Sequence, residues 1–408
     1  MSAPSAPAEG GRFLFVVPPL AGHVNPTVPV GQALADRGHA VAWAGHTEPV
    51  ASLLPPGAGF LPVADAIPPE VAAAVEEKTG RVQAGAASIT GVWEDYVLPV
   101  ARQMAPGVHA AVDAFAPDVL VVDQQALAGA AVAELRGLVW ATSATTPAEL
   151  VPMPDIMAKL REWLAGVLAG LMVDLGVEPA RAARFEPRFS PHLVLAFTTS
   201  YLVGQDRVFP PQYALVGPSI GARPDDTPFP WEWIDGARPL VLVSLGTVNW
   251  RAGERFFRVV ADALAGLDAQ AVVVAPPELV PEPPPNVLVR ARVPQLALLP
   301  KVDAVVCHGG NNTVCESLAE GRPLVVAPMR DDQPFIADQV ARVGAGIRVR
   351  FKRVTPSSLA EALGAVLADP TYRAAAERVR ESFTAAGGPA AAADRLEDLL
   401  ATVRQQSG

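Results

Sequence analysis

The segment RFLFVVP, residues 12–18, is an uninterrupted apolar run close to the start of the chain. A run of this length with β-branched residues is typical of a strand that is buried on both faces of a sheet. A glycine turn follows it, and the next apolar spacing predicts a helix over residues 24–37. Residues 40–44, 118–123 and 138–141 predict strands of the same kind, with a helix between the last two. Strands that alternate with helices in this way predict a doubly wound parallel sheet of the α/β class.

The same alternation starts again at PLVLVSL, residues 239–245, and a helix is expected over residues 253–267. Further strands are predicted at residues 271–275, 286–290, 303–307, 323–327 and 346–350. Residues 217–238 are crowded with Pro, Gly and Asp, which disfavour helices and strands and suit an exposed linker. We therefore predict two Rossmann-like parallel-sheet domains that face each other across a cleft. Their expected bounds are 1–217 for the first domain, 218–238 for the linker, 239–385 for the second domain and 386–408 for a C-terminal helical segment.

Composition argues against several classes of protein. Half of the 408 residues are hydrophobic and 18% are charged, as in a globular protein rather than a disordered one. The net charge of -10 argues against a nucleic-acid partner, which needs clustered Lys and Arg. Cys307 and Cys315 supply no disulfide framework or zinc site and fit a reducing cytoplasm. Residues 1–11 lack the pattern of a signal peptide, and no apolar run is long enough for stable membrane insertion, so we expect a cytoplasmic protein.

A long segment, residues 155–176, has apolar residues at helical spacing. It suits a helix packed against the first sheet, a cover over a substrate cleft, or a helix on a membrane surface. Three large apolar side chains of the first half, Trp93, Met153 and Met157, suit either the core or an aromatic acceptor pocket. Both interpretations of these three residues stay open on sequence alone.

The sequence HGGNNTVCES, residues 308–317, directly follows an expected strand. Two glycines let the backbone approach a ligand closely. The helix that opens at Asn311 presents free N–H groups and a dipole that favour an anion such as pyrophosphate. His308 and the Thr313 hydroxyl can add hydrogen bonds to phosphate oxygens, and the Glu316 carboxylate can accept from both hydroxyls of a ribose. A tight strand-to-helix turn with a buried histidine would explain the same residues without a ligand.

Two neighbouring segments favour the ligand. RVPQ lies upstream at residues 292–295, and PMRDDQ lies downstream at residues 328–333. In this order the three segments resemble the donor motifs of the GT-B glycosyltransferases, in the family that contains plant UDP-glycosyltransferases and bacterial macrolide and polyketide glycosyltransferases. The matching residues are Pro294, Gln295, His308, Gly310, Asn312, Thr313, Glu316, Ser317, Asp332 and Gln333.

The resemblance implies roles for these residues. Gln295 and the backbone at Val293 would hold the base, with Arg292 standing where the plant members have tryptophan. A guanidinium can also stack on a base, so base binding is expected to survive this difference. Glu316 would hold the ribose. The residues implied for the pyrophosphate are His308, Gly310, Asn311, Asn312 and Thr313, closed over by Ser244 and Thr247, and those implied for the sugar hydroxyls are Asp332 and Gln333.

The loop after the first expected strand, PPLAGHVNP at residues 18–26, contains His23. An acceptor hydroxyl needs a base when it attacks the anomeric carbon of a sugar, and histidine titrates in a suitable range. Asp123 ends another expected strand, where it can orient the imidazole and stabilise its charged form. The residues alone leave open a helix cap for His23 and a strand-end cap for Asp123. The Gly-His-x-x-Pro arrangement resembles the N-terminal motif of the same family, which implies that His23 and Asp123 form a catalytic pair.

Together these features predict an inverting, metal-independent O-glycosyltransferase. It would move a hexose, preferably from UDP-glucose, to a hydroxyl of a small apolar natural product such as a polyketide, macrolide or polyphenol. The nucleotide sugar is a co-substrate, and no cofactor or metal is expected. The alternatives are a dTDP-deoxysugar transferase of antibiotic biosynthesis, a sugar-nucleotide epimerase, and a catalytically silent sugar-nucleotide-binding partner. A monomer or a homodimer is expected, and the resemblance implies that a helix at residues 390–404 crosses back to the first domain.

Overall fold

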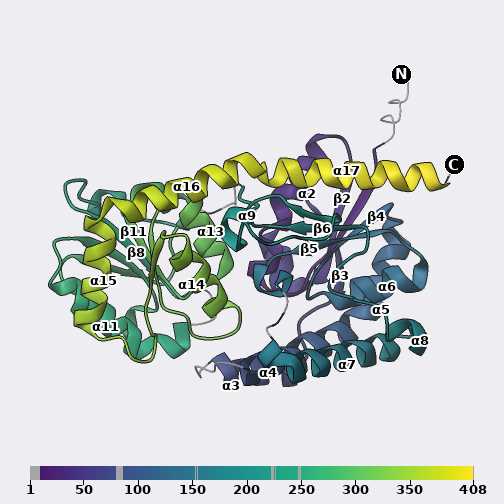
Figure 1. Cartoon of the computed structure of the whole chain (residues 1–408), viewed down its shortest axis with the longest axis horizontal. Coiled ribbons are helices and arrows are strands. Elements are labelled where there is room, and N and C mark those ends of the chain that lie inside the picture. Colours follow the sequence, from purple (N-terminus) through teal and green to yellow (C-terminus); the bar gives the residue numbers. More distant parts are fainter. Residues whose placement is uncertain are drawn as a thin grey trace.

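The computed structural model describes residues 10–79, 86–151, 153, 155–221, 225, 227–246 and 250–407. Two parallel sheets, each covered by helices, lie next to each other along the long axis of the molecule (Figure 1). This arrangement confirms the predicted fold class of two doubly wound parallel-sheet domains.

The first domain contains a 7-stranded sheet in the order β3-β2-β1-β4-β5-β6-β7, and every neighbouring pair is parallel. Its strands are β1 (Arg12–Val16), β2 (Ala40–His46), β3 (Gly59–Ala64), β4 (Val119–Asp123), β5 (Trp140–Ala144), β6 (Leu193–Ala196) and β7 (Tyr213–Leu215). The strand order reverses between β1 and β4. Their carboxyl ends therefore border the crevice in which sheets of this class bind ligands.

The second domain contains a 6-stranded parallel sheet in the order β10-β9-β8-β11-β12-β13. Its strands are β8 (Leu240–Ser244), β9 (Gln270–Val274), β10 (Val287–Arg290), β11 (Ala304–Cys307), β12 (Leu324–Val326) and β13 (Gly346–Arg348). The order reverses between β8 and β11, so this sheet also has a ligand crevice at the carboxyl ends of its central strands.

Helices connect the strands in both domains. In the first domain and the linker they are α1 (Ala21–Val24), α2 (Thr27–Asp36), η1 (Thr47–Ala51), α3 (Pro69–Thr79), α4 (Ala86–Val92), η2 (Trp93–Val97), α5 (Leu98–Phe115), α6 (Leu127–Arg136), η3 (Pro147–Leu150), η4 (Asp155–Met157), α7 (Ala158–Asp174), α8 (Pro179–Ala182), α9 (Ser200–Val203) and η5 (Trp231–Trp233). From the second domain onward they are η6 (Trp250–Gly253), α11 (Glu254–Ala265), η7 (Pro277–Leu279), α12 (Gln295–Leu298), η8 (Leu299–Lys301), α13 (Asn311–Ala319), α14 (Gln333–Arg342), α15 (Pro356–Ala368), α16 (Pro370–Ala386) and α17 (Gly388–Ser407).

Both faces of each sheet are buried, as the continuous apolar strands predict. In β1, Leu14 and Val16 pack in one core cluster with α5 and α6. The alternate residues Phe13 and Phe15 pack on the other face, with α2 and α17. The second sheet repeats this arrangement, because α11 and α15 cover one face and α13, α14 and α16 cover the other.

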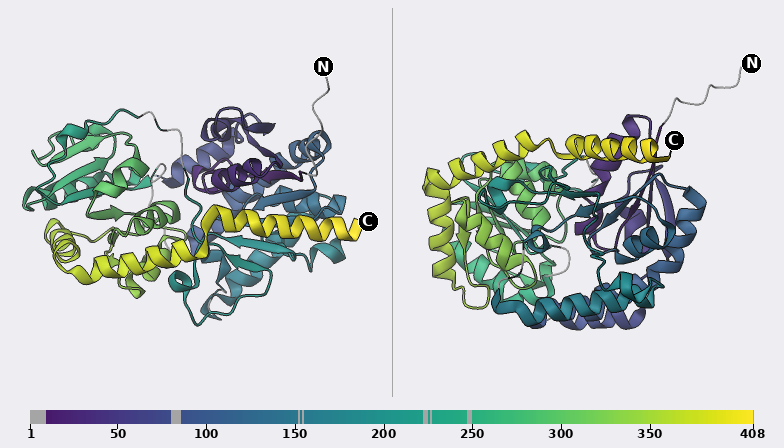
Figure 2. Two further views of the ribbon diagram at one scale, coloured as in Figure 1. Left: turned by 90° about the horizontal axis from the view of Figure 1, so that it is seen from above. Right: turned by 45° about the vertical axis from the view of Figure 1, so that its right-hand side comes forward.

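The C-terminal helices join the two domains across one edge of the molecule. Figure 2 shows α16 on the second domain and α17 continuing along the first. Leu396 and Leu400 of α17 are buried in the core cluster that contains α2. Glu397 accepts hydrogen bonds from Arg37 (2.6 Å) and from His39 (2.8 Å), which holds α17 against the end of α2. The helix expected at residues 390–404 therefore runs along the first domain.

Some local predictions were wrong. The helix expected over residues 24–37 is divided into α1 and α2 at Asn25 and Pro26, because the fixed proline backbone suits the start of a helix better than its interior. The strand expected at 138–141 is displaced to β5 (Trp140–Ala144). The edge strand β3 was not predicted, because it contains Pro62 and is only partly buried, so it lacks a continuous apolar pattern.

The helix expected over residues 155–176 packs within the first domain. It begins with η4 and continues as α7, whose Leu164, Leu168 and Leu171 lie in the core cluster with α5 and α6. The structure thus supports ordinary packing, the first of the three interpretations. Across the described ranges, no helix has both the length and the apolar character that crossing a bilayer requires.

Candidate active site

The predicted catalytic pair is formed at the switch point of the first sheet. His23 lies in α1, just after β1, and Asp123 is the last residue of the adjacent strand β4. The Nδ1 atom of His23 lies 2.9 Å and 3.0 Å from the two carboxylate oxygens of Asp123. The Asp123 side chain is completely buried. Parallel neighbouring strands thus bring together two residues that are far apart in the sequence.

Two further groups hold the Asp123 carboxylate. The backbone N–H of Gln125 donates to Oδ1 (2.9 Å), and the Thr145 hydroxyl donates to Oδ2 (3.0 Å). The same Thr145 oxygen lies 2.8 Å from His23 Nδ1. Sequence reasoning missed Thr145, although it directly follows β5, the strand next to β4. A polar residue at the carboxyl end of a neighbouring strand was the signal that could have found it.

The charge environment of His23 favours its protonated form. Burial is the largest single influence and by itself would lower the pKa of His23, but the charge and hydrogen bond of Asp123, together with Glu149 and Asp332, outweigh burial, so the net pKa is raised. A carboxylate at Nδ1 requires a hydrogen on that nitrogen in the neutral ring. The neutral imidazole therefore carries its free lone pair on Nε2, the atom that can accept a proton from a hydroxyl.

Glu149 is a second carboxylate near His23 that the sequence did not single out. It lies in η3, accepts a hydrogen bond from Gln125 (3.2 Å) and has Arg188 at 3.8 Å. Burial raises the pKa of Glu149, while Arg188 and Gln125 oppose that shift. Its position depends on the fold of the loop after β5, so no sequence motif marks it.

The helix predicted to receive the pyrophosphate, α13, begins beside this pair. The Asn311 side-chain amide donates to the carbonyl of Thr145 (3.0 Å), and that of Asn312 donates to the carbonyl of Gly22 (3.2 Å). Gly22 directly precedes His23, and Thr145 contacts both His23 and Asp123, so the N-terminus of α13 lies against two loops that adjoin the predicted catalytic pair. Its free N–H groups and its dipole favour a negative charge at this point of the cleft.

His308 lies in the turn between β11 and α13, enclosed by two glycines. A Cβ at Gly310 would lie 2.5 Å from its Nε2 atom, and a Cβ at Gly246 would lie 2.8 Å from its Cε1 atom. Burial lowers the pKa of His308 to about 4, and the Arg330 guanidinium acts in the same direction. His308 is therefore neutral near pH 7 and can serve a phosphate as a hydrogen-bond donor rather than as a cation.

The remaining residues of the predicted diphosphate site lie around this turn. Ser244 ends β8, and its hydroxyl oxygen accepts from the backbone N–H of Gly246 (3.2 Å). Thr313 is buried in the first turn of α13. Thr247, which is also predicted to contact the diphosphate, lies outside the described residues.

The residues predicted to hold the base and the ribose are in direct contact. The side-chain amide of Gln295 donates to the Glu316 carboxylate over 2.6 Å. Val293 is buried in the core cluster beside β11, whereas Arg292 is exposed. The two recognition segments at 292–295 and 308–317 thus form one surface of the second domain.

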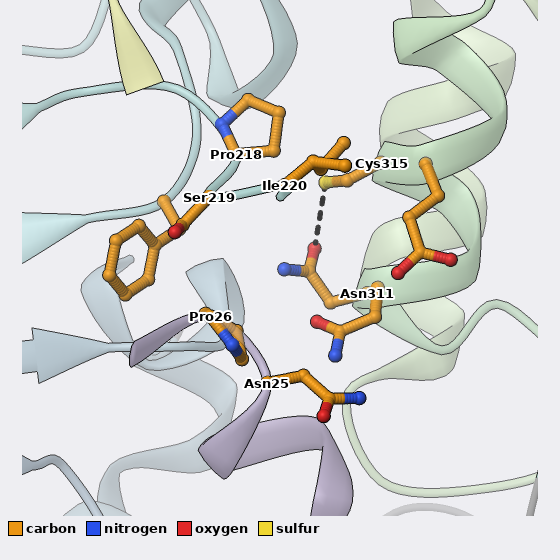
Figure 3. Close-up of a pocket in the computed structure, with 10 residues that line it drawn as sticks. Asn25, Pro26, Pro218, Ser219, Ile220, Asn311 and Cys315 are labelled. Atoms are coloured by element: carbon orange, nitrogen blue, oxygen red, sulfur yellow. Dashed lines mark hydrogen bonds between the residues drawn. The ribbon is translucent and has the colours of Figure 1, made fainter. Parts of the chain in front are cut away.

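A small pocket, with a cavity volume of about 10 Å³, lies between this surface and the first domain (Figure 3). Its lining residues are Asn25, Pro26, Phe197, Pro218, Ser219, Ile220, Asn311, Asn312, Cys315 and Glu316. The Cys315 thiol donates to Asn311 (3.6 Å), and burial raises its pKa to about 12, so this cysteine is not a nucleophile near neutral pH. The pocket adjoins the predicted ribose carboxylate.

The residues predicted to bind the sugar lie at the domain interface. Asp332 accepts a hydrogen bond from the Thr146 hydroxyl (2.6 Å), and burial raises the pKa of Asp332 to about 6. The Gln333 side-chain oxygen accepts from the backbone N–H groups of Met329 (2.9 Å) and Arg330 (3.2 Å). Gln333 therefore fixes the loop, while the Asp332 carboxylate faces the loop after β5.

The three residues considered for an acceptor pocket differ in burial. Trp93 is 4% exposed and belongs to the core cluster of the first domain. Met153 is partly buried against the same cluster, and Met157 is half-buried just before α7. The core interpretation therefore holds for Trp93. In the part of the chain that the structure describes, no group of three or more His, Cys, Asp or Glu residues is arranged to hold a metal ion.

Comparison with known proteins identifies the class. Residues 258–399 match the family described as the C-terminal domain of erythromycin biosynthesis protein CIII-like proteins. The chain is 33% identical to 4'-demethylrebeccamycin synthase of Lentzea aerocolonigenes, over 96% of this chain and 100% of that protein. The glycosyltransferase of kitacinnamycin has a similar structure, with a TM-score of 0.78, 27% identity and coverage of 96% and 99% of the two chains. The glycosyltransferase VinC, solved in complex with dTDP, has a TM-score of 0.73 at 23% identity, over 97% and 100% of the two chains.

This chain belongs to the GT-B glycosyltransferases of natural-product and antibiotic biosynthesis. The resemblance inferred from the donor motifs is thereby confirmed, together with the class of enzyme.

Proposed function

We propose that this enzyme transfers a hexose from a nucleotide diphosphate sugar to a hydroxyl of a small apolar natural product, with inversion at the anomeric carbon. The observation that carries the proposal is the position of the His23–Asp123 pair against the N-terminus of α13. Nε2 of His23 takes the proton of the acceptor hydroxyl, whose oxygen attacks the anomeric carbon. The bond from that carbon to the diphosphate oxygen breaks, and the N–H groups of α13 stabilise the departing charge. Attack from the face opposite the diphosphate inverts the configuration.

The test of this function is a product assay. Mixtures of UDP-glucose, other sugar nucleotides and a panel of phenols and macrolides are expected to give acceptor masses increased by one hexose. Without an acceptor the nucleotide sugar is expected to stay unchanged. An epimeric nucleotide sugar formed without acceptor would instead support the epimerase, and no product from any mixture would support the silent partner.

We predict that transfer continues in excess EDTA. The α13 N-terminus and the neutral His308 offer hydrogen-bond donors to the diphosphate, and these donors replace the charge of a divalent ion. The measurement is the initial rate with and without chelator. Loss of activity in EDTA that magnesium restores would contradict the prediction.

UDP-glucose is the proposed donor, because a carboxylate and an amide suit a fully hydroxylated hexose. We expect Asp332→Ala to weaken binding of UDP-glucose about 10- to 100-fold while changing the affinity for UDP little, because each lost hydrogen bond to a charged group costs roughly 1.5–3 kcal/mol. Calorimetry with both ligands measures the difference. Asp338→Ala is the matched control, since Asp338 lies on the same helix α14 with an exposed side chain. Equal losses for UDP and UDP-glucose would show that Asp332 does not contact the sugar.

A dTDP-deoxysugar is the second candidate donor. VinC binds dTDP, and the exposed Arg292 replaces the tryptophan of the plant members. Comparing the affinity of the parent enzyme for UDP and for dTDP separates the two donors. Tighter binding of dTDP than of UDP would favour a dTDP-deoxysugar over UDP-glucose as the donor and would leave the enzyme class unchanged.

A further inference from the structure

We propose that Thr145 is a positioning residue that aligns the His23–Asp123 pair and connects it to the donor-binding helix α13. This inference rests on the proposed function of His23 as the base. Thr145 follows β5 directly and is 3% exposed, so both its hydroxyl and its carbonyl are directed by the protein rather than by solvent.

The hydroxyl of Thr145 contacts both members of the pair. It donates to Asp123 Oδ2 (3.0 Å), and its oxygen then presents a lone pair to the Nδ1–H of His23 (2.8 Å). Nδ1–H is therefore shared between Asp123 and Thr145, which restricts rotation of the ring about its Cβ–Cγ bond. A fixed ring keeps Nε2 directed towards the acceptor, and this kind of orientation is what groups behind a catalytic histidine supply.

The carbonyl of Thr145 faces the opposite domain. It accepts from the side chain of Asn311, the first residue of α13 (3.0 Å). Thr145 thus contacts the proposed general base, His23, through its side chain and contacts α13, the helix predicted to bind the diphosphate, through its backbone. The next residue continues this interface, because the Thr146 hydroxyl donates to Asp332 (2.6 Å).

The charged groups around His23 come from three elements. Asp123 ends β4, Glu149 lies in η3, and Asp332 precedes α14 on the second domain. Without the Thr145 hydroxyl, Asp123 Oδ2 loses a buried donor and its charge acts more strongly on the imidazolium. The pKa of His23 is then expected to rise, while the direction of the ring becomes less defined.

The experiment compares Thr145→Val, which has nearly the same shape without the hydroxyl, with Thr145→Ser, which keeps the hydroxyl. We expect Thr145→Val to lower kcat about 10-fold, the effect of one hydrogen bond to a charged group, with both KM values within about 2-fold of the parent. The acid limb of the kcat/KM profile is expected to shift to higher pH. Thr145→Ser is expected to restore most of kcat and the parental acid limb.

A second measurement does not depend on activity. Histidine nitrogen NMR, with the His23 signal assigned through His23→Gln, is expected to show a neutral ring protonated at Nδ1 in the parent. In Thr145→Val, Asp123 is expected to keep the proton on Nδ1, but the pH at which the ring gains its second proton is expected to rise, and Thr145→Ser is expected to resemble the parent. Parental kcat, pH profile and His23 titration in Thr145→Val would overturn the positioning role. Full activity of His23→Ala would instead show that His23 is not the general base. The failure of the positioning role and the failure of the proposed function are therefore distinguishable.

Discussion

His23→Ala is expected to lower transfer to hydroxyl acceptors about 10²- to 10⁴-fold, the usual effect of losing a general base. The affinity for the nucleotide diphosphate is expected to change little, because the proposed general base would act on the acceptor and the predicted donor site lies in the second domain. Steady-state rates and calorimetry with UDP measure the two effects. Parental turnover in the variant would refute the assignment of His23.

The pH profile of the parent gives a second check on His23. The base works only when its ring is neutral, so kcat/KM is expected to fall as the pH falls through the pKa of His23. That pKa is raised by Asp123, so the midpoint is expected above the ordinary histidine value of 6.5. Asp332, with a pKa of about 6, titrates nearby. The limb that belongs to His23 is the one that disappears in His23→Ala.

Gly310→Ala is expected to weaken donor binding by at least about 10-fold. The added Cβ would lie 2.5 Å from Nε2 of His308, closer than real Cβ contacts allow. His308 or the start of α13 must shift, and either shift would misplace N–H groups that are predicted to bind the diphosphate. Calorimetry with UDP measures the loss.

The matched control is Gly166→Ala in α7, where no atom lies within 4 Å of the new Cβ. This change is expected to leave UDP affinity unchanged and to stabilise the protein by roughly 0.5–1 kcal/mol, because alanine is the better helix former. Unchanged affinity in Gly310→Ala would show that the position of His308 does not matter for the donor.

The sequence predicts all six strands of the second sheet and misses β3, β6 and β7 of the first. Strands such as β1, β4, β8 and β11 are buried on both faces, and their apolar runs are unbroken. Edge strands such as β3 and β7 are exposed on one side, so their sequences contain residues that also suit loops.

The site residues divide by whether a motif marks them. His23, Asp123 and the glycines around His308 end or follow inner strands within motifs whose residue types indicate chemistry. Thr145 also follows an inner strand, β5, but no motif marks it, and the contacts of Thr145 and Glu149 depend on how the loop after β5 folds. The amide-to-carbonyl bonds from α13 to the first domain also require both domains to be in place.

The two covalent connections between the domains meet at one edge of the molecule. Gly388 donates its backbone N–H to the carbonyl of Val216 (2.7 Å), and a Cβ on Gly217 would lie 3.1 Å from Ala386. Gly217, Gly387 and Gly388 all have positive φ, so both crossings turn sharply at glycines. Two adjacent crossings act as a hinge, and the domains can then separate most easily by rotating about this edge. Opening about this edge would widen the far side of the cleft most.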